Sequence, residues 1–187
     1  LSLPLPDSLI DTFHDGELLS PANNAKIKGD LFLSSYTIHG ASDILYPLFF
    51  WNIFGTETVG AGRSFFYFIT LALKVSSIFL SYQLTKLSKI DLNNKNIFFI
   101  FLTILILSMS KYQVPINFSY FSYRDIFVIL FLIFFIEIFK NSNYKKISHI
   151  LISFIASISL FLHIDTGIFL NILILSYIFY LLLNKKK

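Results

Sequence analysis

The chain has 187 residues, of which 55% are hydrophobic and only 14% carry a charged side chain. Soluble domains are charged at roughly a quarter of their positions, so this composition excludes an ordinary soluble domain and favours an integral membrane protein whose apolar surface faces lipid. The chain has no cysteine, which excludes disulfides and thiolate metal sites. The net charge of +4 has to be judged by where the charges lie.

Residues 1–60 form a polar segment that holds seven of the eleven acids. The first residues lack the basic group that opens a signal peptide, and because the chain begins at Leu1 we expect a truncated N-terminus. Further along, Ser42 is predicted to cap a short helix over Asp43–Phe54, which Gly55 ends. This aromatic helix is too short to cross a bilayer, and we interpret it as an interfacial or re-entrant helix.

Five apolar segments follow, and each is bounded by charged or turn residues. They are Ser64–Tyr82, Asn96–Ser110, Asp125–Phe139, Ile147–Leu162 and Gly167–Leu183. Several are shorter than the ~20 residues of a typical membrane span, but their boundaries still predict helices. The expected fold class is therefore all-α. We expect a polytopic bundle of about five spans over residues 61–187, preceded by a non-cytoplasmic loop, residues 1–60, that contains short interfacial helices.

The basic residues predict the topology of this bundle. Nine of the fifteen lie in three alternate places, namely residues 84–96, the loop after the third span and the C-terminal tail. Cytoplasmic loops are enriched in Lys and Arg, so these places are predicted to be cytoplasmic. The opposite side then holds residues 1–60, the loop 111–124 and a tight turn at 163–166. The Ile/Phe/Lys/Asn bias fits a bacterium. We therefore expect a protein of the bacterial inner membrane whose acid-rich side is periplasmic or extracellular.

The predicted outer face collects carboxylates, imidazoles and guanidiniums at one boundary between membrane and water. They belong to Asp15, Glu17, His39, Asp43, Arg63, Arg124, Asp125, His163 and Asp165. A carboxylate can deprotonate an acceptor hydroxyl, and Arg, His or a divalent cation can take the charge of a departing phosphate. Such a site suits a reaction between a lipid-linked phosphate and a polar acceptor. We expect membrane lipid as a partner and no nucleic acid.

Short motifs in a particular order run through residues 14–66. They are His14-Asp15-Gly16-Glu17, Lys28-Gly29-Asp30, Tyr46-Pro47-Leu48, Ile53-Phe54-Gly55 and Gly62-Arg63. This order resembles the first outer loop of GT-C membrane glycosyltransferases, and the dolichyl-phosphate-mannose protein mannosyltransferase-like branch is the most similar. The resemblance implies inverting transfer of a sugar from a polyprenyl-phosphate donor, with Asp15 matching the catalytic acid. Because Gly16 separates the two acids, which of Asp15 and Glu17 is the base stays open.

Two further motifs resemble the outer ends of spans in some bacterial relatives: Tyr123-Arg124-Asp125 and His163-Ile164-Asp165-Thr166-Gly167. Each also has a structural interpretation. Arg124 and Asp125 can form a local ion pair, and His163 and Asp165 can simply flank a turn. The family consists of larger bundles, so the resemblance implies that this chain is a fragment.

The first-loop candidates have structural alternatives too. His39 and Asp43 can bind phosphate or a metal, or they can form a turn that caps the following helix. Arg63 can contact a lipid phosphate in the site, or anchor a helix end among headgroups. A divalent cation is compatible with the acids, but two acids do not define its ligands, so the metal site is left unassigned.

The leading function is a glycosyltransferase that moves a sugar from a polyprenyl-phosphate donor to an acceptor on the non-cytoplasmic face. The alternative is a non-enzymatic polytopic membrane protein, namely a transporter or flippase component, or an inactive fragment. A transporter is expected to carry ionisable residues inside its spans. Only Lys74 and the near-terminal Glu137 lie there, which favours the enzyme.

Overall fold

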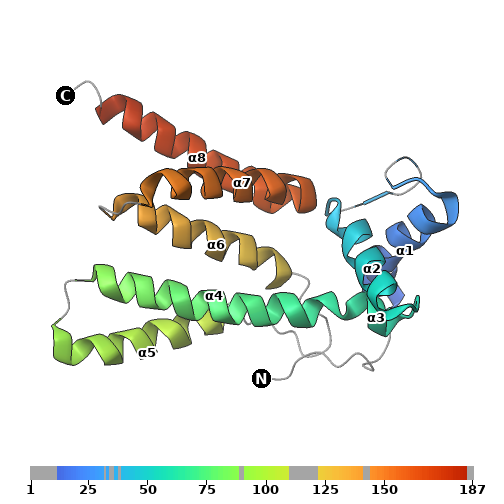
Figure 1. The fold of residues 1–187 in the computed structure, drawn as a ribbon, viewed down its shortest axis with the longest axis horizontal. Helices are drawn as coiled ribbons and strands as arrows, with labels where there is room; N and C mark the ends of the chain where they lie inside the picture. The colour runs from blue at the N-terminus through green and yellow to red at the C-terminus, as the bar shows by residue number, and fades with distance from the viewer. Residues whose placement is uncertain are drawn as a thin grey trace. The chain divides into compact units, whose positions relative to one another are not determined.

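The structure is a computed structural model that describes residues 12–31, 33, 36–37, 39–88, 91–109, 122–140 and 144–184. Within these ranges the chain forms helices joined by turns, without a strand, so the all-α prediction is confirmed. The chain divides into two compact units, of which the first runs to Leu71 and the second begins at Ala72. Figure 1 labels the helices of both units. The division falls inside α4 (Phe65–Leu87).

The N-terminal unit contains α1 (Thr12–Lys28), α2 (Ser42–Phe54), α3 (Val59–Arg63) and the first turns of α4. An apolar cluster holds the first three helices together. Its buried members are Ala22 of α1, Trp51 of α2 and Ala61 of α3, and Leu19 and Leu48 pack against them. Small residues on α1 and α3 let both helices approach the indole ring closely, so the single tryptophan of the chain is the centre of this unit.

No individual helix is predicted in the polar stretch before residue 42, yet α1 occupies 17 residues of it. The helix contains Pro21 and ends where Gly29 adopts φ 73°, a left-handed conformation that glycine reaches without strain. Lys26 and Lys28 lie in its last turn, where positive charge interacts favourably with the helix dipole.

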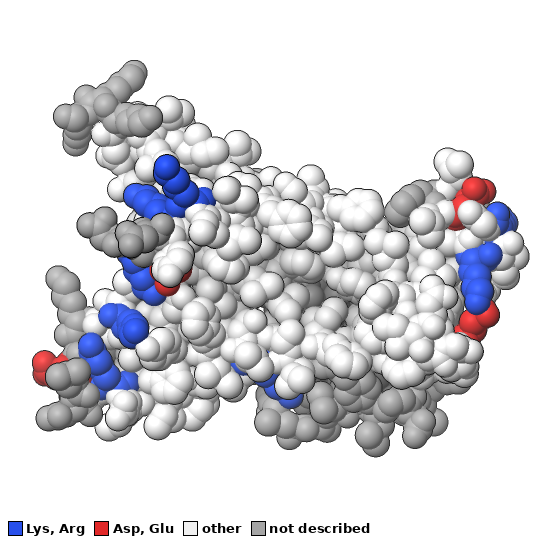
Figure 2. Space-filling view, viewed as in Figure 1, with Lys and Arg blue, Asp and Glu red and all other residues white. Residues whose placement is uncertain are grey.

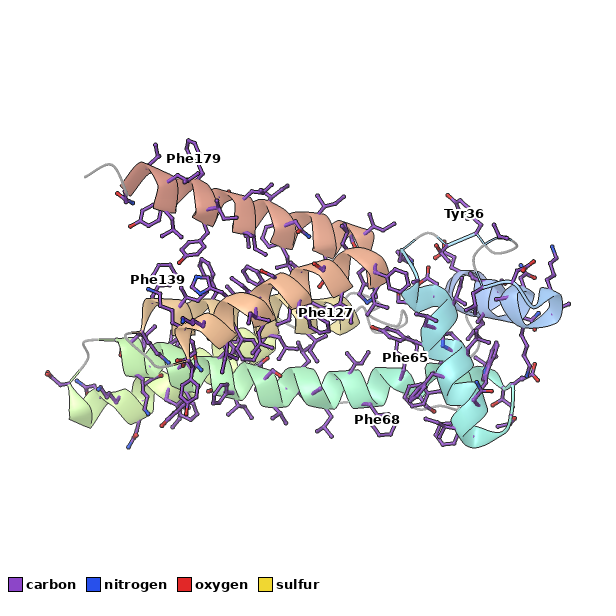
Figure 3. The ribbon with its side chains drawn as sticks, turned by 45° about the horizontal axis from the view of Figure 1, so that its top comes forward. Tyr36, Phe65, Phe68, Phe127, Phe139 and Phe179 are labelled. Atoms are coloured by element: carbon purple, nitrogen blue, oxygen red, sulfur yellow. The ribbon has the colours of Figure 1, made fainter. Side chains whose placement is uncertain are left out.

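The aromatic helix α2 is confirmed, and so is its end. Gly55 adopts φ 64° and ψ 20°, the left-handed conformation that terminates a helix. The predicted cap at Ser42 is wrong, because Ser42 is already helical and Ala41 takes the N-cap position without a side-chain hydrogen bond. One face of α2 packs on α4, with Tyr46 4.9 Å from Phe65 and Phe50 5.5 Å from Phe68 between ring centroids (Figure 3).

The C-terminal unit contains the rest of α4, then α5 (Leu92–Met109), α6 (Ser122–Phe139), α7 (Lys145–Leu162) and α8 (Ile164–Asn184). Each of the five apolar segments therefore coincides with a helix. Two clusters hold the bundle together. Leu73 and Leu80 of α4 pack with Ile129 and Ile133 of α6, and a second cluster joins α6, α7 and α8 around Phe131.

The connection between α7 and α8 is tighter than predicted. A single non-helical residue, His163, separates the two helices, so the turn expected over residues 163–166 is wrong beyond its first residue. The helices touch where Gly167 lies against Leu160, and Asn171 Nδ2 donates across the pair to the carbonyl oxygen of Ala156 at 3.2 Å. The result is a closely packed helical hairpin.

Three helical segments in the described residues are long and apolar enough to cross a membrane: Val59–Leu87, Lys145–Leu162 and Ile164–Asn184. Two shorter apolar helices accompany them, Asn94–Leu107 and Ile126–Phe139. Large apolar side chains are exposed along these helices, and Phe179, 64% exposed, points away from its neighbours (Figure 3). Hydrocarbon would be a favourable surrounding for such a surface.

Candidate functional site

A buried carboxylate lies in the first turn of α2. Asp43 is 1% exposed, and its Oδ2 accepts a hydrogen bond from the backbone N–H of His39 at 3.1 Å. The ring Nδ1 of His39 lies 3.3 Å from the same oxygen. On the other side, Ser42 Oγ donates to Asp43 Oδ1 at 3.4 Å. A carboxylate is costly to bury without such partners, so this cluster is a specific arrangement rather than a solvated surface acid.

The imidazole of His39 is partly open to solvent, since its side chain keeps 24% of its exposure. Between His39 and α2, Gly40 adopts φ 131°, a conformation that L side chains rarely take. This glycine lets the chain fold back so that His39 reaches Asp43 four residues later. The geometry fits the turn interpretation of the pair, because Asp43 ties the preceding turn to α2, and binding of phosphate or a metal stays a prediction.

Arg63 ends α3 and is 2% exposed. Its burial disfavours a simple headgroup anchor, whose guanidinium would lie at the surface. The position of α3 is set by Thr58, whose Oγ1 accepts from Ala61 N at 3.2 Å, and by Trp51 Nε1, which donates to the Thr58 carbonyl at 3.0 Å. The N-terminal unit thus buries a guanidinium on a helix that is bonded to α2.

Asp15 and Glu17 both lie on α1. Positions two residues apart on an α-helix point about 200° away from each other, so the two acids cannot grip one small ligand side by side. Glu17 is half-buried, and the side chain of Asp15 lies outside the described part of the structure. The assignment of Asp15 as catalytic acid stays a prediction, and α1 allows one of the pair to act.

The remaining candidates belong to the C-terminal unit. Arg124 and Asp125 lie in the first turn of α6, and their side chains are outside the described part. His163 is buried, with its ring 5.6 Å from that of Phe127. Asp165 is exposed, and its Oδ1 accepts from Thr166 N at 2.9 Å in the first turn of α8. The convergence of these residues on Asp15 and Glu17 stays a prediction.

No group of three or more metal-binding side chains (His, Cys, Asp or Glu) that could hold a metal ion lies in the described ranges. The described residues therefore do not assign ligands to the divalent cation that the sequence leaves open.

Lysines gather at one end of the C-terminal unit (Figure 2). They are Lys86 at the end of α4, Lys95 in α5, Lys140 after α6, and Lys145 and Lys146 at the start of α7. Glu137, an acid at this end, accepts from Lys140 at 2.7 Å. Asp165 lies beyond the other end of α7, which is about 27 Å long at 1.5 Å per residue. Within this unit the lysines are therefore gathered at one end, and two described acids, Asp91 and Glu137, lie at the same end.

Comparisons with models of protein families, with curated proteins and with solved structures found no match to this chain.

Proposed function

We propose that the protein is a membrane glycosyltransferase that moves a sugar from a polyprenyl-phosphate donor to an acceptor on the non-cytoplasmic face. The observation that carries the proposal is the buried Asp43 with its partly exposed His39 partner, in the same unit as a buried Arg63. An acid–imidazole pair can manage the proton of an acceptor hydroxyl, and a guanidinium can stabilise phosphate charge. The order of motifs over residues 14–66 supports the same reaction.

The topology that goes with this function has five spans, α4 to α8. The two helices α5 and α6 have 18 residues each. They are about 27 Å long, close to the ~30 Å of a bilayer core. Crossing by all five puts the lysine-rich end in the cytoplasm and the N-terminal unit on the other side, as in a bacterial inner membrane with a periplasmic site.

In this proposal one carboxylate of α1, Asp15 or Glu17, takes part in catalysis, and the other candidates of the outer face bind the donor or acceptor. The phosphate leaves carbon C1 of the sugar with its bonding electron pair. The acceptor oxygen forms the new bond to C1 and gives up its proton to a base. Burial of the site's charges strengthens each of these electrostatic interactions.

The proposal is tested with the complete protein in membranes supplied with polyprenyl-phosphate mannose or polyprenyl-phosphate glucose. We expect release of free polyprenyl phosphate, measured by mass spectrometry, to rise with the amount of the protein. A well-inserted protein that releases none from either donor, in the presence of the native membrane acceptors, would refute the proposed function.

A further inference from the structure

The imidazole of His39 is held from one side. The backbone N–H and the ring Nδ1 of His39 both approach Asp43 Oδ2, the backbone nitrogen at 3.1 Å and Nδ1 at 3.3 Å. The opposite ring nitrogen, Nε2, has no hydrogen-bond partner among the described residues. The side chain of Asp43 is 1% exposed while that of His39 is 24% exposed. The carboxylate of the pair is therefore buried, and the imidazole is partly open to solvent.

A neutral imidazole carries its proton on one nitrogen and offers the other as an acceptor. The partner of the first nitrogen decides which tautomer forms. A buried carboxylate next to Nδ1 favours the tautomer with the proton on Nδ1, which leaves the lone pair on Nε2. The ring of His39 approaches a buried carboxylate in this way. By contrast, the Nδ1 atom of His149 lies 2.7 Å from the backbone carbonyl of Lys145.

We propose that His39 is the catalytic residue that accepts the proton of the acceptor hydroxyl, and that Asp43 is its positioning residue. The proposal rests on the proposed function. As the acceptor oxygen forms its bond to C1 of the sugar, its proton moves to His39 Nε2, and the bond from C1 to the phosphate oxygen breaks with its electron pair on the phosphate. The acceptor class is therefore an alcohol, a sugar or serine-type hydroxyl, which cannot attack efficiently without losing its proton.

This assignment differs from the one that motif order implies, where Asp15 is the base. Geometry favours His39 because its orientation is fixed by two contacts with a buried group, whereas Asp15 and Glu17 diverge on α1. The acids on α1 remain available to bind the acceptor.

The test uses three variants of the complete protein. His39→Gln keeps the backbone N–H that bonds to Asp43 and removes the imidazole. Asp43→Asn keeps the size of the positioning residue and removes its charge. His149→Gln is the matched control, because it removes an imidazole from the C-terminal unit. Side-chain ¹⁵N NMR of the detergent-solubilised protein reports the tautomer of each histidine, and the His39 signals are assigned by their loss in His39→Gln.

We expect the Nδ1–H tautomer at His39 and its loss in Asp43→Asn. Release of polyprenyl phosphate should fall about 10²–10⁴-fold in His39→Gln, as on removal of a positioned base, and stay unchanged in His149→Gln. The Nε2–H tautomer in the unaltered protein, or full activity in a folded His39→Gln, would overturn the inference. If the unaltered protein releases no polyprenyl phosphate, the proposed function itself is refuted. That result is seen before any variant is compared.

Discussion

Replacing Gly167 with alanine should force α7 and α8 apart at their turn. A Cβ atom added at Gly167 would lie 2.7 Å from Leu160 Cβ and closer still to the Leu160 backbone, whereas ordinary contact begins at 3.4 Å. The nearest atom, Leu160 Cα, would lie 2.1 Å away, so this separation must grow by about 1.3 Å. Backbone cannot swing away as a side-chain tip can, so overpacking of this kind costs about 1–3 kcal/mol.

The same movement stretches a hydrogen bond. Asn171 Nδ2 already lies 3.2 Å from the Ala156 carbonyl, so a further separation breaks this link between the helices. Its loss adds about 1 kcal/mol, and the total destabilisation is then about 2–4 kcal/mol. For a chain of this size, the apparent Tm in detergent should fall by roughly 5–15 °C.

A matched glycine serves as the control. Gly16 lies inside α1, and a Cβ atom added there would meet nothing within 4 Å. Gly16→Ala should therefore be neutral or stabilise the protein by up to about 1 kcal/mol, because alanine is the better helix former. Equal Tm values for Gly16→Ala and Gly167→Ala would refute the packing argument for the α7–α8 turn.

Two smaller predictions concern the N-terminal unit. Thr58→Ala removes the hydroxyl that caps α3 and should cost about 1 kcal/mol, measured as a lower Tm, while Thr58→Ser should restore most of it; no difference between alanine and serine would speak against the cap. An α2 that lies in the membrane interface should present Phe49 to lipid and not Trp51, because Phe49 is 59% exposed and Trp51 is 5% exposed. Phe49→Trp, made in a Trp51→Phe background, should therefore be quenched by brominated lipids more strongly than the native Trp51. Equal quenching would place neither face of α2 in lipid.

The helices of the bundle could be predicted from the sequence because their signal is strong and local. Each apolar segment is flanked by charge or turn residues, and a helix satisfies all of its internal backbone hydrogen bonds by itself. The end of α2 could also be predicted from the sequence, since Gly55 is a residue that tolerates the left-handed conformation seen there. Apolar patterning and glycine placement thus account for most of the fold.

What could not be predicted depends on tertiary contacts. α1 lacks an apolar stripe and contains Gly16 and Pro21, so it is stabilised by the packing of small residues on Trp51. A signal existed in Lys26 and Lys28 just before Gly29, the pattern of a helix C-terminus. The cap at Ser42 failed because the chain turns at Gly40 and the helix begins one residue early.

The candidate site follows the same division. The spacing of His39 and Asp43 was visible in the sequence, but burial of the carboxylate and the approach of the backbone N–H and ring Nδ1 of His39 to one oxygen are properties of the folded unit. Thr58 was missed altogether, although a threonine three residues before Ala61 is a recognisable N-cap. Which acid of α1 acts could not follow from sequence, since it depends on whether that segment is helical.

The most direct test of the account is the side of the membrane on which each unit lies. The chain has no cysteine, so single cysteines can be placed at Asn23 on α1 and at Asn94 near the lysine-rich end, both exposed positions. In intact cells an impermeant maleimide should label Asn23→Cys and should label Asn94→Cys only after the membrane is permeabilised. Labelling of Asn94→Cys but not Asn23→Cys in intact cells would contradict the topology and the non-cytoplasmic site together.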